Sequence, residues 1–252
     1  MKISRSALAV SLLALVTSAP AFAQDQPQRH LVYNFTFGVQ NDEHDTNASI
    51  RQVNSPTASG GYQNVYGTGD TKYDSTATDI GTITVDILGV QPDGGLHVRV
   101  AEVGRYYRRS APMDCVVYPT TKVACTGRPY PEEADVISTL SPGFFNPAVL
   151  DAKNHWRVAD VIPGLTLDFT ASAPSGSVVS IAEDKNQKMS GGLGGTDHGS
   201  ATFTYDTVRR IPTALKTYDT QRPAQGQPGQ YANIILNITA TLATDSGTTA
   251  KN

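Results

Sequence analysis

The stretch GGLGGTDHGSATFTYD, which begins at Gly191, places an aspartate and a histidine inside a glycine-rich segment. In many hydrolases an imidazole acts as general base and a neighbouring carboxylate orients it. His198 and Asp197 are therefore catalytic candidates that need a nucleophile from elsewhere in the chain. The chain contains no G-x-S-x-G nucleophile elbow and no H-E-x-x-H zinc motif. We therefore assign no catalytic residue and interpret Gly191–Gly199 as a flexible connection between strands.

The same glycines do not complete a cofactor motif. The dinucleotide fingerprint G-x-G-x-x-G has Asp197 in place of its third glycine, and the Gly-Lys-Ser/Thr of a phosphate-binding loop is missing. The calcium β-roll repeat G-G-x-G-x-D is matched once, with its aspartate displaced by one residue. We expect no cofactor.

A second chemical candidate is the acidic stretch NDEHD. Asp42, His44 and Asp45 offer the oxygen and nitrogen ligands that calcium or zinc prefers. Adjacent residues on an extended chain point in opposite directions, and neither an EF-hand spacing nor a complete set of zinc ligands is present. We predict a solvated acidic loop and no metal site.

A third candidate combines basic and aromatic residues in the stretch RYYRR. On a strand, Arg105, Tyr107 and Arg109 share one face, where they can contact an anionic head group or a glycan at a barrel mouth. The simpler interpretation is an exposed strand end whose arginine stems cover apolar surface. We name these three residues, together with the single tryptophan, Trp156, as candidate ligand-binding residues.

The two cysteines, Cys115 and Cys125, are interpreted as a disulfide that closes a short hairpin around a Pro-Thr-Thr turn. Their spacing excludes a C-x-x-C redox pair.

Alternation of apolar and polar residues predicts many strands with one buried face. The most secure hairpin joins residues 83–87 to residues 96–100 through a Pro-Asp-Gly turn. Similar runs occupy residues 31–39, 116–118, 122–124, 165–171, 201–205 and 234–242. Because one face of each strand is polar, we expect an antiparallel sheet. The polar stretches Gln40–Ser59 and Thr213–Gly229 are predicted to be long loops.

One helix is expected, over PEEADVISTL. It begins near Pro131, with acidic residues in its first turn, and ends near Ser141. We predict an all-β fold: a single antiparallel β-barrel, half-barrel or sandwich-like domain with a short helical insertion around residues 131–150. This architecture resembles the lipoprotein-carrier fold, in which a curved sheet wraps a helical plug around an apolar cavity, although a fold does not fix a function.

The first residues have the pattern of a secretory leader. Lys2 and Arg5 precede a short apolar run, and Ala21-Phe22-Ala23 is a cleavage signal without a lipid-accepting cysteine. We expect cleavage after Ala23, a periplasmic or secreted product, and a single β-rich domain over residues 24–252 with a polar, flexible C-terminal tail. No later stretch is apolar enough for a transmembrane segment.

The charge argues against nucleic-acid binding, and the one-sided strands, the helical insertion and the basic-aromatic stretch favour a binding function. Loss of Lys2 and Arg5 with the leader changes the formal net charge from −3 to −5, without the basic excess of a nucleic-acid-binding protein. We interpret the chain as a non-enzymatic binding or carrier protein for an apolar or amphiphilic molecule such as a lipid. The alternatives are a structural domain that binds an envelope protein, and a hydrolase that uses His198 and Asp197.

Overall fold

The computed structural model describes residues 27–56, 62–106, 109–147, 150, 153–159, 164–188, 195–223 and 230–247. Within these ranges the side chains of residues 41–56, 62–75, 159, 223 and 230–233 are not described. The expected leader, the candidate Tyr107 and the first four glycine-loop residues, 191–194, lie outside the described residues.

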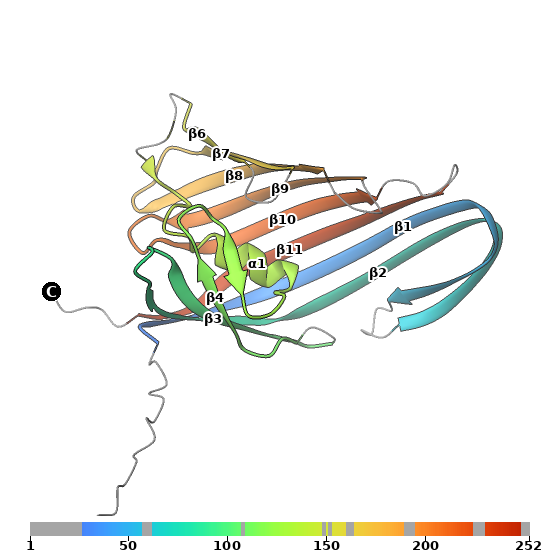
Figure 1. Cartoon of the computed structure of the whole chain (residues 1–252), viewed down its shortest axis with the longest axis horizontal. Helices are drawn as coiled ribbons and strands as arrows, with labels where there is room; N and C mark the ends of the chain where they lie inside the picture. Colours follow the sequence, from blue (N-terminus) through green and yellow to red (C-terminus); the bar gives the residue numbers. More distant parts are fainter. Residues whose placement is uncertain are drawn as a thin grey trace, which may run out of the picture.

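In the described part of the chain, eleven strands form one open antiparallel sheet, and one short helix lies against its face (Figure 1). The strands are β1 Arg29–Pro56, β2 Tyr62–Val90, β3 Leu96–Gly104, β4 Met113–Val117, β5 Val123–Cys125, β6 His155–Ala159, β7 Leu165–Ala171, β8 Val178–Lys188, β9 Gly195–Asp206, β10 Ile211–Pro223 and β11 Gln230–Gly247. The all-β prediction with a helical insertion is confirmed. The sheet is open, as in a half-barrel or a sandwich, so the closed-barrel alternative does not apply.

The strand order is β5-β4-β3-β2-β1-β11-β10-β9-β8-β7-β6. Consecutive strands pair with each other, except that β5 and β6 form the two edges of the sheet and β1 pairs with β11 at its centre. Figure 1 shows β6 to β11, β1 and β2 as one broad surface, with α1 and β4 in front of it. This arrangement gives the sheet an inner face toward the helix and an outer face toward solvent.

The helix α1, Pro131–Ser138, supplies apolar side chains to the inner face of the sheet. Val136 and Ile137 are fully buried, and Leu140 and Phe144 follow them into the same core. The sheet contributes alternate residues from most strands, among them Leu31, Tyr33, Phe35, Ile83, Val85, Val98, Val100, Ile181, Phe203, Leu215 and Ile238. Burial of these side chains is the main force that holds the helix on the sheet.

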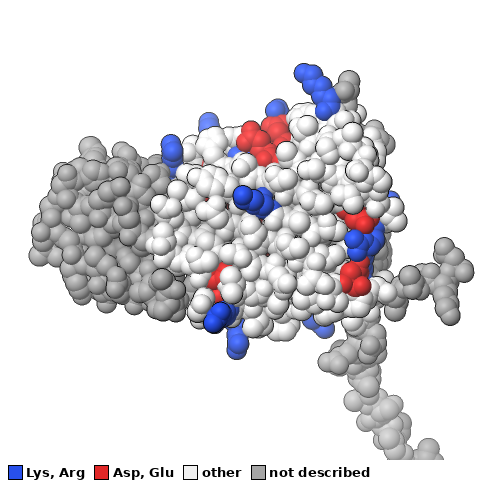
Figure 2. Space-filling model, turned by 180° about the vertical axis from the view of Figure 1, so that it is seen from behind, with Lys and Arg blue, Asp and Glu red and all other residues white. Residues whose placement is uncertain are grey.

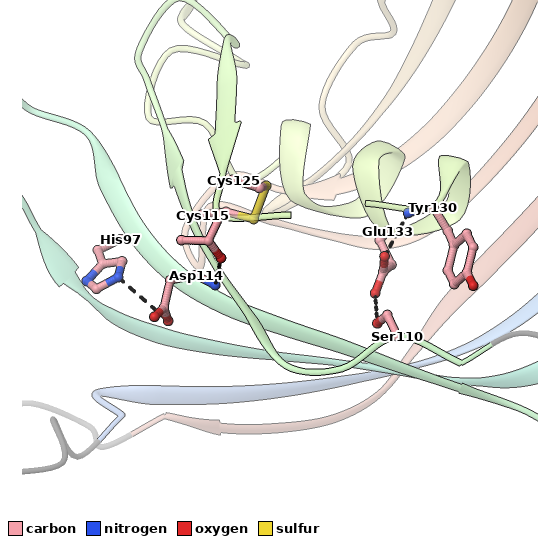
Figure 3. Close-up of a disulfide and its surroundings, with 8 residues drawn as sticks. His97, Ser110, Asp114, Cys115, Cys125, Tyr130 and Glu133 are labelled. Atoms are coloured by element: carbon pink, nitrogen blue, oxygen red, sulfur yellow. Dashed lines mark hydrogen bonds and ion pairs between the residues drawn. A yellow bond between two sulfur atoms is a disulfide. The ribbon is translucent and has the colours of Figure 1, made fainter. Parts of the chain in front are cut away.

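Polar contacts fix the start of α1 (Figure 3). The backbone N–H of Tyr130 donates to Oε2 of Glu133 at 2.8 Å, which satisfies a free donor at the helix start. The hydroxyl of Ser110 donates to the other oxygen of Glu133, and Ser110 Oγ accepts the backbone N–H of Glu102 on β3 at 2.8 Å. The helix is therefore tied to the sheet at its first turn. It ends at Ser138, three residues before the expected end.

Cys115 and Cys125 are joined as a disulfide between directly paired positions of β4 and β5 (Figure 3). The turn between these strands is closed by a hydrogen bond from the N–H of Tyr118 to the carbonyl of Lys122, at 2.8 Å. This agrees with the hairpin expected from the sequence.

Two predicted loops are wrong. Residues of Gln40–Ser59 extend β1, and this extension pairs with β2 from Gln40 opposite Thr76 as far as Pro56 opposite Tyr62. The stretch predicted as a loop from Thr213 lies in β10 up to Pro223. Ladder hydrogen bonds use backbone groups, so polar side chains do not prevent a paired strand.

The outer face is weakly charged. Figure 2 views the molecule from the side opposite to Figure 1, where Lys, Arg, Asp and Glu are scattered among larger areas of uncharged residues. Outward positions on the central strands are rich in threonine, including Thr36, Thr82, Thr84, Thr202, Thr204, Thr239 and Thr241.

Candidate functional site

A cavity of about 580 Å³ lies between α1 and the inner face of the sheet. Strands β7 to β10 form one wall, while α1, β5 and residues 127–129 form the other. Strand β5 is at one edge of the strand order and β7 is next to the other edge. The cavity therefore lies inside the curve of the sheet.

One part of the cavity wall is aromatic and aliphatic. Phe144, which follows α1, makes edge-to-face contacts with Phe169 of β7 and Phe203 of β9, with ring centroids 5.6 Å and 5.3 Å apart. Leu165 and Leu167 of β7 extend this surface. It can accept the hydrocarbon part of a ligand.

A second part of the wall is polar and follows the inward positions of β8 and β10. Along β8 the inward residues change from Val179 and Ile181 to Glu183 and Lys185. The inward positions of β10 change in the same direction, from Leu215 to Asp219. The polar side chains come together because the two strands flank β9 in register.

Lys185 is the centre of this polar group. Its Nζ lies 2.9 Å from Asp219 Oδ2 and 3.1 Å from Asp197 Oδ2. Burial lowers the pKa of Lys185, but the two carboxylates outweigh this effect and raise the pKa above the usual value. Lys185 is therefore protonated and its charge is already paired within the wall.

Gly199 of β9 makes the ion pair between Lys185 and Asp219 possible. It lies directly opposite both Lys185 and Asp219 in the strand register. A Cβ atom at Gly199 would lie 1.8 Å from Asp219 Oδ1 and 3.4 Å from Lys185 Cδ. The missing side chain leaves the space in which the two charged groups meet.

Two more carboxyl groups line the cavity and have raised pKa values. Burial raises the pKa of Glu183 to about 8, and the charge of Asp135 contributes to the increase. Burial raises the pKa of Asp135 on α1 to about 7, and the charge of Asp219 contributes. Glu183 makes no hydrogen bond or ion pair with any described residue. Both groups change charge near neutral pH.

The structure separates the two catalytic candidates. Asp197 is buried on the inner face, 5% exposed, and is bound to Lys185. His198 is the next residue of β9 and is exposed on the outer face. Neighbouring residues of a strand point to opposite faces, so these two side chains do not form a base-and-orienter pair. The interpretation of residues 195–199 as a loop is corrected, since they begin β9.

Arg105, Arg109 and Trp156, the candidate ligand-binding residues that the structure describes, are not part of the cavity wall. Arg105 is exposed after β3 and lies over the ring of Tyr106, 5.3 Å from its centroid. Arg109 is exposed and forms an isolated bridge to Val103. Trp156 is buried and stacks on Phe169 with ring centroids 5.0 Å apart, so it supports a cavity residue. The ligand role of these side chains stays a prediction.

The metal candidates Asp42, His44 and Asp45 lie in β1, and their side chains are outside the described residues. Among the side chains that are described, no group of three His, Cys, Asp or Glu is arranged to hold a metal ion.

A second cavity, of about 570 Å³, lies at the other end of the helical insertion. Arg29, Arg209 and Arg210 line it together with apolar residues such as Leu140 and Ile211. Arg29 and Arg209 both bind Asp245, at 2.7 Å and 3.1 Å. The sequence did not single out these arginines, which are far apart in the chain and come together because β11 pairs with both β1 and β10.

No family model matches this chain, and no curated protein does. One solved structure, described as lipid–protein interactions in lipovitellin, is similar with a TM-score of 0.45 and 9% sequence identity. The likeness covers 91% of this chain and 26% of the lipovitellin chain, so this chain spans about a quarter of that length. In the described ranges, no helix has the length and hydropathy of a membrane span.

Proposed function

We propose that this protein is an exported, non-enzymatic binding protein that holds an apolar or amphiphilic small molecule in the cavity between α1 and strands β7 to β10. The observation that carries the proposal is the cavity itself, about 580 Å³ in volume, with an aromatic wall next to a polar one. Sites for small ligands have volumes of roughly 300–1,000 Å³ and combine apolar walls with a few placed polar groups.

The side chains of the cavity wall support a binding role over catalysis. The aromatic wall comes from Phe144, Phe169 and Phe203, which hold no nucleophile. The buried ammonium group of Lys185 is held in ion pairs with two aspartates. These features suit retention of a ligand that has one hydrocarbon part and one polar part.

Export is the second part of the proposal. The leader pattern of residues 1–23 is its support, and the Cys115–Cys125 disulfide is typical of proteins that fold in an oxidising compartment. We place the mature protein in the periplasm or the medium.

The experiment is to fill the cavity. Ala201 of β9 is 5% exposed and lines the cavity, whereas its neighbour Thr202 is exposed on the outer face. We expect Ala201→Phe to weaken binding of the neutral fluorescent probe N-phenyl-1-naphthylamine by tenfold or more. Thr202→Phe is the matched control and should bind like the wild type.

A second blocking variant covers the case in which Ala201→Phe does not fold. Ala134 lies on α1 and lines the same cavity from the helix side. Ala134→Phe should also weaken binding of the neutral probe. Unchanged binding in a folded blocking variant would contradict the proposal and leave a structural, envelope-protein-binding role as the better explanation.

A further inference from the structure

The buried charged groups at the cavity have an excess of negative charge. Lys185 is bound by Asp219 and Asp197, so two carboxylates already face one ammonium group. Glu183 on the sheet side and Asp135 on the helix side add two more carboxyl groups to the cavity lining. Two further cations, Lys122 and Arg128, line the cavity, but both are exposed, and neither is among the charges that act on Glu183.

One carboxylate oxygen of Asp219 lacks a hydrogen-bond donor, which is a second observation that points to a ligand. The residue is 7% exposed, lines the cavity, and binds Lys185 through Oδ2. Its Oδ1 accepts no hydrogen bond from the residues that the structure describes. A buried carboxylate oxygen without a donor has lost its water without gaining a partner, so a donor brought by a ligand would be bound favourably.

Glu183 is placed to share such a donor. It lies on the inner face of β8, one inward position before Lys185, and its register partner Ala201 leaves the space above β9 open. Phe169, directly opposite on β7, belongs to the aromatic wall. An apolar surface and a partnerless carboxyl group therefore adjoin each other at one point of the cavity.

We infer that the cavity selects amphiphiles whose polar end is a positively charged hydrogen-bond donor, such as a primary ammonium group, bound by Glu183 and Asp219 with the hydrocarbon part against Phe144, Phe169 and Phe203. This inference rests on the proposed function. An ammonium group satisfies both requirements of the site, because it brings the missing charge and donates up to three hydrogen bonds. A carboxylate or phosphate end group would face the three carboxyl groups that line the cavity, those of Asp135, Glu183 and Asp219.

The test compares three amphiphiles of equal chain length: dodecylamine, dodecanol and dodecanoate. Their dissociation constants are measured on the mature protein by displacement of N-phenyl-1-naphthylamine, at pH 8.5 and below the micellar concentration of each compound. We expect dodecylamine to bind at least tenfold more tightly than dodecanoate. Such a ratio is the usual size of one charge-assisted contact.

Two variants locate the selectivity. Glu183→Gln removes the charge with little change in shape and should weaken dodecylamine binding about tenfold while dodecanol binding changes less. Asp184→Asn is the matched control, because Asp184 is the next residue of β8 and is exposed on the outer face. It should leave all three dissociation constants unchanged.

The outcomes separate the two levels of the argument. Equal binding of the three compounds, tighter binding of dodecanoate, or an unchanged amine preference in folded Glu183→Gln would overturn the inference while leaving the proposed function in place. Failure of all three compounds to bind would overturn both.

Discussion

Lys185 of β8 and Asp219 of β10 are two strands apart, and their ion pair passes over Gly199 of β9 with a distance of 2.9 Å between Nζ and Oδ2. The pair crosses the intervening strand because that strand has no side chain at this point. Gly199 belongs to the glycine-rich stretch that first attracted attention in the sequence. Its role in the structure is to leave room for a buried charge pair.

The first prediction concerns that glycine. Gly199→Ala places a Cβ atom 1.8 Å from Asp219 Oδ1, so either the strand or the carboxylate must move and the ion pair is lost. Disruption of a buried ion pair costs about 3–5 kcal/mol, and we expect a decrease of this order in the free energy of unfolding measured in urea. Gly38→Ala in β1 is the control, since its Cβ would meet no atom closer than 3.7 Å. Equal stability of the two variants would contradict the role given to Gly199.

The second prediction concerns pH. Glu183 has a pKa of about 8 in the folded protein and an ordinary value of 4.5, so the unfolded chain ionises first as the pH rises. The folded state therefore loses stability progressively between about pH 4.5 and pH 8. The charged groups that act on Glu183 are Asp135, Lys185, Asp219 and Asp184.

Glu183→Gln removes this dependence. We expect the loss of unfolding free energy between pH 5 and pH 8.5 to be smaller in this variant by about 1–3 kcal/mol than in the wild type. Thermal unfolding followed by circular dichroism at both pH values measures it, with Asp93→Asn as the control, because Asp93 is exposed and is not among the charges that act on Glu183. Parallel pH profiles for Glu183→Gln and the wild type would show that Glu183 is ionised in both states.

The third prediction concerns the disulfide. Cys115 and Cys125 are ten positions apart, and a bridge that closes so short a loop stabilises a protein by about 2–3 kcal/mol. Cys115→Ser combined with Cys125→Ser should lower the free energy of unfolding by this amount. Reduction of the wild type should have the same effect and should leave the double variant unchanged. A stability independent of reductant would contradict a structural role for the bridge.

The fourth prediction concerns the attachment of the helical insertion. Phe144 is 3% exposed and contacts Phe169 and Phe203, so Phe144→Ala should cost about 3–5 kcal/mol. The near-ultraviolet signal of Trp156 should also change, because this ring stacks on Phe169. Val208→Ala, at a position that is 79% exposed, is the control and should be neutral. A neutral Phe144→Ala would mean that the insertion is held elsewhere.

Sequence patterns predicted the strands whose inward residues are apolar. Strand β7 was predicted with its observed limits, and the hairpin of β2 and β3 was found with its Pro-Asp-Gly turn, where Gly94 has a φ of 82°. In these strands the alternation of apolar and polar residues reports the two faces of the sheet directly.

Two strands of the polar cavity wall were missed because their sequences do not alternate between apolar and polar residues. In β8 and β10 the inward positions include Glu183, Lys185 and Asp219, so polar residues occupy both faces and the alternation disappears. Each of these strands begins with alternating residues and then becomes polar on both faces. This change of pattern is the feature of the sequence that could have indicated a strand lining a polar cavity. The β10 stretch was interpreted as a loop and the β8 stretch was left unassigned, because the apolar pattern is lost in both.

The grouping of these polar side chains in one cavity could not be predicted from the sequence. Asp135, Glu183 and Asp219 come from a helix and two strands, and only the register of β8, β9 and β10 brings them to one cavity. From the sequence, Asp197, which is bound to Lys185, was named only as a partner for His198. The side chain of His198 lies on the outer face of the sheet.

The most direct test of the central claim is the identity of what the protein carries. Mature protein purified from its native host would be extracted with organic solvent and the extract analysed by mass spectrometry, in parallel with Ala201→Phe and Thr202→Phe. The account predicts a stoichiometric amphiphile in the wild type and in Thr202→Phe, and its loss from Ala201→Phe. The same amphiphile at equal abundance in all three proteins, or none above the level of an unrelated β-protein, would contradict a ligand held in the cavity behind α1.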